Sequence, residues 1–377
     1  MKNKVVNVKL NSYQMFPEKQ LTNITTQHIP WGLDNAYPYF LEGLLNKSSI
    51  HANIQYGKAD LTLGKGLTWD STNLISAQQA AISKLYYSPN GNETLDELIM
   101  KLILDYIIYG QNAIQIIWSK DRNSIAEIYH VPMGKLRFEK PDMNGEIKNV
   151  LYSDNWLQYR KSQFAPEKIK LFDLADRQDP RQIIITSQYN VGSPIYSQPQ
   201  YSASIPYILT DWHVAQYNLN TAQSSLSPDF ILNISGLQTE EEQNDFYDTF
   251  ENDFMNSTGA KVLVTFAENK DMAPTLQTVE SNNQDKYIQL TDTVNSQILI
   301  ANKVVSPLLV GIKTEGQLGG NTELQTAFRL YYEQTIKQIQ NAVIKPINSK
   351  ILKINGVSGD GYVFINPELM NLENNII

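Results

Sequence analysis

The feature that most constrains this chain is a pair of long helical segments that flank a short insert. The first runs from Pro206 to Leu226, and its apolar residues alternate steps of three and four, as in a coiled-coil-like seam. Asp211 is its only formal charge, so most of the helix surface is uncharged and is expected to pack on more than one side. Pro228 ends this helix, and a second one is predicted from Asn283 to Lys303. Two long, weakly polar helices of this kind need other protein surface to cover them.

The insert between the two helices is predicted to be a small αβ unit. One strand is expected at Phe230–Ile234 and another at Lys261–Phe266. The helix between them begins with Thr239 and Glu242 at capping-box spacing. One face of that helix carries Phe246, Phe250 and Phe254.

The part of the chain before the first long helix has α+β character. Residues up to about Ser48 are rich in turn formers, and a short helix is expected from Ser48 to Ala59. A clearer helix starts at Thr94, which forms a capping box with Glu97, and stops near Gly110, where glycine supplies a left-handed cap. Alternating or β-branched runs then predict strands at Ala113–Trp118, Ile125–Val131, Leu136–Phe138, Val150–Tyr152, Ile169–Phe172 and Ile183–Thr186.

A glycine-rich segment and a further long helix follow Lys303. The segment from Val304 to Asn321 contains Pro307 and several glycines, which make the backbone adjustable. The final long helix is expected to begin at Thr322, and Pro346 inside it should kink or break it. One more strand is predicted at Tyr362–Ile365.

Composition narrows the classes of function. The chain has 377 residues, no cysteine and a formal net charge of -8. The lack of cysteine excludes a disulfide scaffold, a thiolate metal site and a cysteine nucleophile. A DNA binder that reads sequence usually carries a basic patch, so this acidic chain is not expected to bind DNA tightly, which still allows it to surround DNA loosely. No stretch is long and apolar enough for a bilayer, and Met1–Leu10 lacks the apolar core of a signal peptide. We therefore expect synthesis in the cytoplasm and no membrane partner.

Motifs for catalysis or cofactor binding are not found. None of the four histidines stands at metal-ligand spacing, and His130 and His213 are expected to be packed or surface residues. Lys65 is followed by Gly66 where a phosphate loop needs serine or threonine, so this segment should be a turn. There is no GxSxG elbow, and the acidic residues show no nuclease spacing. The sequence thus predicts no enzyme activity, no cofactor and no metal.

Four short stretches follow one another in an order that is informative when they are taken together. They are the helix-to-strand junction Asp105–Ala113, the strand Glu127–Pro132, the Tyr189–Ile195 segment ahead of the first long helix, and Ile300–Gly311. In this order they resemble the siphophage-type phage portal family, over roughly Ser48 to Leu352. Val304-Val305-Ser306-Pro307 departs from the family's Phe-Gly-Val-Pro-Pro, which leaves the local loop geometry open.

The resemblance implies a phage portal fold with an α+β wing, a two-helix stem, a small αβ clip, a tunnel loop and a long kinked helix. Because the sequence ends soon after the last long helix, the helical crown is expected to be short or absent. The implied boundaries are 1–203 for the wing, 204–227 and 281–303 for the stem helices, 228–280 for the clip, 304–321 for the tunnel loop region, 322–352 for the kinked helix and 353–377 for the tail.

The resemblance also implies a function. The chain would be a structural subunit of a homo-oligomeric ring, expected to be a dodecamer, at the capsid vertex of a tailed-phage virion. Double-stranded DNA would pass through the ring non-specifically during packaging and ejection. The implied partners are the terminase large subunit, which supplies ATP hydrolysis, then the head–tail connector, and the major capsid protein. Assembly would take place in the host cytoplasm.

Three sets of residues would carry this role. The predicted DNA-facing tunnel loop consists of Gly311, Ile312, Lys313, Thr314, Glu315, Gly316, Gln317, Leu318, Gly319 and Gly320. The predicted stem interface between subunits consists of Ile205, Ile208, Trp212, Ala215, Leu219, Tyr287, Leu290 and Val294. The clip surface predicted to dock the motor and the connector consists of Phe230, Ile231, Leu232, Phe246, Phe250, Val262 and Val264. Two alternatives stay open: Lys313 as a solvated loop charge, and the seam as an intrachain helix contact.

Two other functions stay open at this point. Another head–tail connector or a baseplate-type ring protein is usually shorter and lacks two long helices around an insert. A phage-associated hydrolase, either nuclease or peptidase, would need clustered carboxylates or a histidine pair in a cleft. A central channel lined by the helices at Ile205 and Tyr287 would separate the portal from the first alternative, and converging acidic side chains would favour the second.

Overall fold

The structure, a computed structural model, divides into two units, each of which is described by itself. The first unit comprises Met1–Leu209 with Val294–Ile377, and the second comprises Thr210–Thr293. The boundary between the units therefore crosses both of the long helices. The described residues are 26–32, 34–193, 195–224, 230–235, 239–250, 262–267, 283–312, 321–359 and 361–366.

The first unit is built on a six-stranded mixed sheet with the order β3-β2-β7-β6-β5-β4. Neighbouring strands are antiparallel except β6 and β7, which are parallel. Every strand predicted from the β-branched runs of this part is present, and the α+β class is confirmed. The bounds are β2 (Gln111–Trp118), β3 (Ile125–Val131), β4 (Leu136–Phe138), β5 (Asn149–Tyr152), β6 (Glu167–Leu171) and β7 (Arg181–Ser187).

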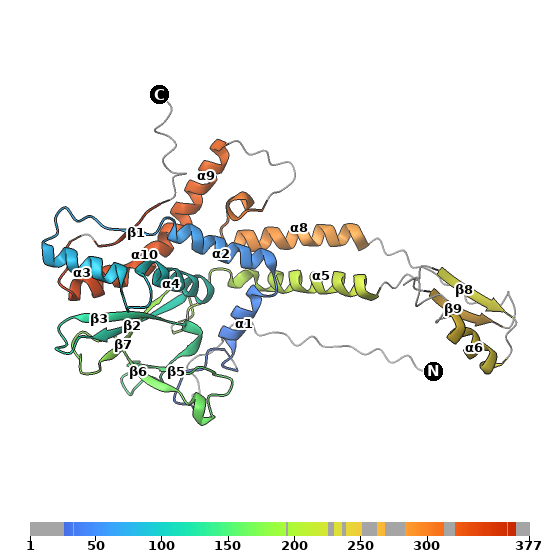
Figure 1. Cartoon of the computed structure of the whole chain (residues 1–377), viewed down its shortest axis with the longest axis horizontal. Helices are drawn as coiled ribbons and strands as arrows, with labels where there is room; N and C mark the ends of the chain where they lie inside the picture. The colour runs from blue at the N-terminus through green and yellow to red at the C-terminus, as the bar shows by residue number, and fades with distance from the viewer. Residues whose placement is uncertain are drawn as a thin grey trace. The chain divides into compact units, whose positions relative to one another are not determined.

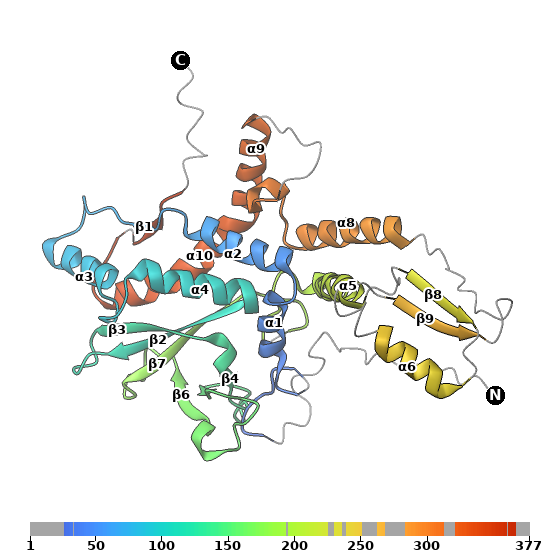
Figure 2. The ribbon, with the colours of Figure 1, turned by 45° about the vertical axis from the view of Figure 1, so that its right-hand side comes forward.

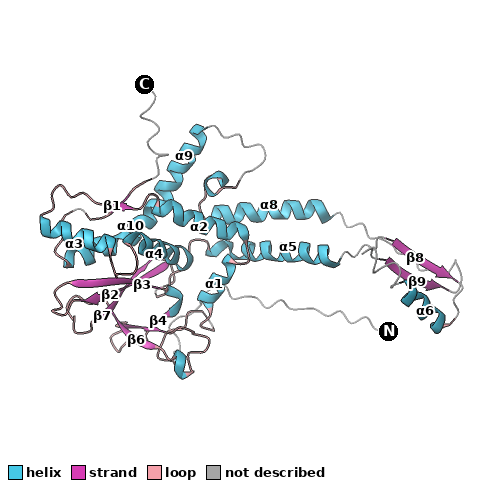
Figure 3. Cartoon of the chain, in the orientation of Figure 1, coloured by secondary structure: helices cyan, strands magenta, loops and turns pink. Residues whose placement is uncertain are grey.

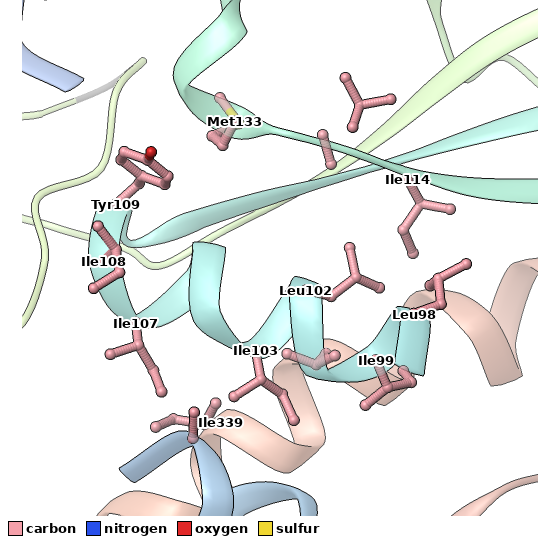
Figure 4. Close-up of a cluster of buried hydrophobic side chains, with 14 of the residues drawn as sticks. Leu98, Ile99, Leu102, Ile103, Ile107, Ile108, Tyr109, Ile114, Met133 and Ile339 are labelled. Carbon is pink, nitrogen blue, oxygen red and sulfur yellow. The ribbon is translucent and has the colours of Figure 1, made fainter. Parts of the chain in front are cut away.

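Helices lie on one side of this sheet (Figures 1 and 2). Helix α4 (Leu95–Tyr109) packs on β2 and β3, and α2 (Ser49–Leu63) packs on α4. Helix α10 (Lys337–Pro346) contacts α4 and β7. Figure 4 shows Leu102 of α4 directed toward Ile114 of β2, and Ile107 directed toward Ile339 of α10. These side chains are buried, and each contributes about 1.5–3 kcal/mol to folding.

The ends of α4 have the chemistry that the sequence predicts. The Thr94 backbone N–H donates to Glu97 Oε2 at 2.7 Å, and the Glu97 N–H donates to Thr94 Oγ1 at 3.4 Å, which completes the capping box. Gly110 follows the helix with φ 72° in the left-handed region. A Cβ at this position would lie 2.8 Å from the carbonyl oxygen of Gln198, so the junction into β2 requires glycine.

Two helices of the first unit are not predicted by the sequence patterns. Helix α1 (Tyr37–Leu45) falls in the segment expected to be turn-rich, and that expectation is wrong over these residues. It has Pro38 in its first turn and no side-chain cap. Helix α3 (Ser76–Tyr87) buries only Ile82 and Leu85, so it lacks the apolar stripe that marks a helix in sequence.

The C-terminal helical segment changes its helical geometry at the position where a kink or break was expected. Helix α9 (Asn321–Tyr331) leads through a π-helical turn, Tyr332–Ile336, into α10. A second π-helical turn, Ile347–Leu352, follows Pro346 directly. The expected kink or break at Pro346 takes the form of this change from α-helical to π-helical geometry, since proline has no N–H to donate to the i→i−4 ladder and π turns occur where that ladder is interrupted. The chain then adds β10 (Val363–Phe364), which is antiparallel to β1 (Leu67–Thr68).

The second unit contains the strand–helix–strand insert expected from the sequence (Figure 3). Strand β8 (Phe230–Ser235) is parallel to β9 (Val262–Ala267), and α6 (Glu240–Phe250) lies between them in sequence. The Thr239 and Glu242 backbone N–H groups each donate to the other residue's side chain at 3.3 Å, which confirms the second capping box. Two longer helices lead into and out of this insert. They are α5 (Ile205–Ser224, 20 residues) and α8 (Asn283–Ala301, 19 residues), each about 30 Å long.

Candidate functional site

The apolar seam on α5 begins inside the core of the first unit. Ile205 and Ile208 are fully buried there, and Val294 of α8 is buried in the same core. The apolar character of these three residues is thus accounted for by packing within one chain. Tyr201, just before α5, strengthens this attachment because its hydroxyl donates to the carbonyl oxygen of Ile108 at 2.9 Å.

Farther along, both long helices keep apolar side chains at their surface. Leu219 of α5 is 48% exposed and Leu290 of α8 is 38% exposed. Ala215 is exposed and Trp212 is half-buried. Tyr287 belongs to α8, but its side chain lies outside the described residues. Leu219 and Leu290 are the clearest remaining candidates for contact with another subunit.

The predicted DNA-facing loop begins at a tight turn. The 3₁₀ helix η6 (Pro307–Val310) ends at Gly311, whose φ of 74° is left-handed. Ile312 is half-buried against the core of the first unit. The remaining predicted loop residues, 313–320, lie outside the described residues, so the role given to Lys313 stays a prediction.

The predicted docking residues of the insert occupy all three of its elements. Phe230, Ile231 and Leu232 lie in β8, and Val262 and Val264 lie in β9. The side chains of these strand residues and of Phe250 in α6 are outside the described set. Phe246, also in α6, is half-buried. Docking through this surface stays a prediction.

Buried polar side chains of helix α2 form hydrogen bonds with the segments next to both long helices. Gln55 Nε2 donates to Asn302 Oδ1 at 2.9 Å, and Lys58 Nζ donates to the same oxygen at 2.9 Å. Lys58 Nζ also donates at 3.4 Å to Gln200 Oε1. Asn302 directly follows α8, and Gln200 lies in residues 195–204, which we call the connector into α5. One helix thus holds the segment that ends α8 and the segment that begins α5.

The same helix also contacts the segments on both sides of the predicted loop. Asn53 Nδ2 donates to the carbonyl oxygen of Val310 in η6. Gln340 Nε2, on α10, donates to the carbonyl oxygen of Thr62 at 2.8 Å. Helix α2 therefore contacts the chain before and after residues 313–320, and it also contacts the segments next to α5 and α8.

The polar side chains of α2 lie in a strongly desolvated environment. Lys58 is 1% exposed and His51 is fully buried. Burial, and then the charge of Lys303, lower the pKa of Lys58 to about 7. Burial, and then the charge of Lys58, lower the pKa of His51 to about 3. This polar cluster was not predicted, although its members recur at the i, i+3 and i+4 spacing of one helix face: Ser48, His51, Gln55, Lys58 and Thr62.

The histidine that comes nearest to an acid–base pair has a structural role. His130 Nε2 lies 2.9 Å from Asp105 Oδ2, and both side chains are 14% exposed. The same carboxylate oxygen accepts the Met133 backbone N–H at 2.8 Å. The pair therefore ties α4 to the end of β3, as expected of a packed histidine. His213 is exposed on α5.

The Gly-Lys segment near residue 65 forms the expected turn. Gly66 has φ 91°, and its N–H donates to the carbonyl oxygen of Leu63 at 3.0 Å. Asp96 Oδ1 accepts the Leu67 N–H at 3.0 Å, so a carboxylate lies against the backbone of this turn. Over the described residues, no three His, Asp or Glu side chains are grouped so that they could hold a metal ion. In the same part of the chain, no helix is long and apolar enough to cross a bilayer.

Comparison with known proteins identifies the fold. No protein-family model and no curated protein matches this sequence. Among solved structures, a chain in the neck of an empty gene transfer agent particle, computed with C6 symmetry, aligns with a TM-score of 0.64 at 13% identity, covering 89% of this chain and 86% of that one. A chain in the neck of the native particle, computed with C12 symmetry, gives a TM-score of 0.58 at 13% identity, covering 90% and 86%.

A further solved structure that aligns with this chain is described as a phage portal protein. It is a HK97 family phage portal protein from Corynebacterium diphtheriae, with a TM-score of 0.48 and 9% identity over 89% of this chain and 97% of that one. The two neck chains establish that this chain has their fold, which agrees with the α+β class and the order of elements expected from the sequence.

Proposed function

We propose that this chain is the portal subunit of a tailed-phage or phage-like particle, and that its copies form a ring around a DNA channel. One observation carries the proposal: the fold is shared over 90% of the chain with a neck chain in a particle computed with C12 symmetry. A closed ring needs a heterologous interface that is repeated around an axis. Exposed Leu219 and Leu290 supply apolar surface that such an interface would cover.

The charge of the chain supports loose passage of double-stranded DNA. Each phosphate that a protein neutralises adds affinity through counterion release, and many such contacts would stop sliding. A net charge of -8 per chain works against strong phosphate binding. In this proposal the segment 311–320 flexes against DNA, and Lys313 makes transient phosphate contacts.

The remaining assignments complete the proposal. The β8–α6–β9 insert docks the terminase large subunit during packaging and a head–tail connector afterwards, and the motor supplies ATP hydrolysis. The ring, expected to be a dodecamer, lies at the capsid vertex beside the major capsid protein, after assembly in the host cytoplasm. The chain itself acts as a structural subunit without catalysis.

Imaging the purified full-length chain tests this function. We expect negative-stain images to show rings with a central hole, and mass photometry to give one dominant mass that is an integral multiple of 42.9 kDa. A chain that stays monomeric at every concentration and salt condition would contradict the proposal. A ring whose channel is not lined by α5 and α8 would instead favour another kind of connector.

A further inference from the structure

Lys58 is buried without a carboxylate partner among the described residues. Its Nζ donates to two neutral amide oxygens, Asn302 Oδ1 at 2.9 Å and Gln200 Oε1 at 3.4 Å. An ammonium group out of water is costly unless an opposite charge compensates it. A neutral amine still has two N–H donors, which is enough for these two contacts, and it avoids the cost of burying a charge.

Asn302 is itself fixed by the way α8 ends. Lys303 adopts a left-handed φ of 54°, its N–H donates to the carbonyl oxygen of Ile300 at 2.9 Å, and the Val304 N–H donates to that of Leu299 at 3.0 Å. These bonds form a Schellman motif with lysine at the position that usually holds glycine. The motif directs the Asn302 side chain toward α2 and places the Lys303 charge near Lys58, where it disfavours a second positive charge.

The other titratable groups around Lys58 offer it no counter-charge. His51 lies on the same helix with its ring against Tyr201 of the connector, at 4.5 Å between centroids. On α4, the helix packed against α2, Asp96 accepts from the Leu67 N–H and Asp105 pairs with His130. Glu97 pairs with Thr94, Glu42 accepts from Tyr109, and Glu333 of the π-helical turn packed on α2 pairs with Lys337. Asp60 lies on α2 itself but is exposed. The hydrogen-bond partners of the Lys58 amine are thus neutral amides, and burial, then the charge of Lys303, lower its pKa to about 7.

We propose that Lys58 is a positioning residue sensitive to protons: its uncharged amine holds the end of α8 and the connector into α5 against α2, and its protonation loosens this junction. The proposal does not depend on ring formation, because all of these groups belong to the first unit of a single chain. Loosening of α2 would also affect η6, because Asn53 of α2 donates a hydrogen bond to the carbonyl oxygen of Val310. Protonation of one amine would therefore release the supports of both long helices and of the segment entering residues 313–320 together.

The direction of the pH effect follows from linkage. Lys58 has a pKa of about 7 in the fold and 10.5 as the ordinary value, so between these values the open form binds more protons than the closed form. Stability of the closed junction therefore rises with pH through this window and is lowest below it. The ideal limit is a change of about tenfold in the local opening equilibrium per pH unit.

Hydrogen exchange of the full-length chain, measured from about pH 6 to about pH 9 to bracket this pKa, tests the proposal. After correction for the intrinsic exchange rate, we expect peptides covering 295–312 to become more protected as pH rises in the wild type. Lys58→Met should remove this dependence, and Lys84→Met, at an exposed position on α3, should leave it intact. Lys303→Met, which keeps a side chain of similar length without its charge, should move the midpoint to higher pH.

Two results would overturn the proposal. One is an unchanged pH dependence in Lys58→Met. The other, which needs no variant and so covers the case in which Lys58→Met fails to fold, is direct titration of the Lys58 amine by NMR with a midpoint near its ordinary 10.5. Neither result bears on ring formation, which imaging reports separately.

Discussion

Arg137 shows how a single residue joins the N-terminal segment to the sheet. Its guanidinium is fully buried and donates to the carbonyl oxygens of Gly134 and Asn35 at 2.8 and 2.9 Å. The same group lies 5.6 Å from the ring centroid of Trp31 and 5.0 Å from that of Trp156. Burial lowers the pKa of Arg137 to about 10, so the group stays charged at neutral pH and its charge is met by carbonyl dipoles and aromatic faces.

Replacing Arg137 should therefore cost far more than replacing an exposed arginine. We expect Arg137→Met to lower the free energy of unfolding by about 3 kcal/mol, because several buried carbonyl groups lose their donor. Arg160→Met is the matched control, since Arg160 is exposed and lies over Tyr159 at 5.8 Å, and it should change stability by less than about 0.5 kcal/mol. Urea titrations at constant m-value make the comparison. Equal stabilities of the two variants would show that the buried fork of hydrogen bonds contributes little.

At the scale of elements, the α4–β2 junction depends on a close backbone approach. Gly110 and Gly91 both have positive φ, 72° and 78°, but a Cβ at Gly91 would meet nothing within 4 Å. Gly91→Ala should thus report the left-handed strain alone, about 1 kcal/mol. Gly110→Ala adds the clash with the Gln198 carbonyl and should cost at least about twice as much. Thermal unfolding of both variants gives the difference, and indistinguishable values would mean that the connector moves away from the junction at no cost.

Elements with their own boundary chemistry or apolar period could be predicted from the sequence. The capping box at Thr94, the cap at Gly110 and the β-branched runs locate α4 and the sheet strands within a few residues. Helices α1 and α3 could not be predicted in this way, because the first has a nearly continuous apolar run and the second almost no buried face.

The polar junction at α2 belongs to the part that local patterns do not contain. Lys58 meets Gln200 and Asn302 at sequence separations of 142 and 244 residues, and no periodicity connects residues so far apart. For the apolar seam, the sequence pattern is visible, but it does not show which of its residues are buried. Ile205 and Leu219 carry the same pattern, but only the fold distinguishes the buried residue from the one that is 48% exposed.

At the scale of the whole molecule, charge and exposed apolar surface have different ranges of action. The net charge of -8 per chain would be multiplied in a ring, yet at physiological salt each charge is screened within about 8 Å. Repulsion from DNA would therefore act only near the channel wall. Self-association must rely on short-range contacts, and the apolar residues exposed on α5 and α8 are the surfaces to test.

Two neighbouring residues of α5 separate a subunit interface from general effects of added charge. Leu219 lies on the apolar seam, whereas Asn218 is exposed beside it and off the seam. We expect Leu219→Glu to shift the population from rings to smaller species by at least about tenfold, because a carboxylate buried against a neighbouring copy would cost more than about 1.4 kcal/mol. Asn218→Glu adds the same charge one residue away and should leave the distribution as in the wild type. Mass photometry at matched concentrations measures both, and circular dichroism checks that the monomers are equally folded. If both variants assembled alike, the seam would not be the contact between copies, and the apolar character of Leu219 would need another explanation.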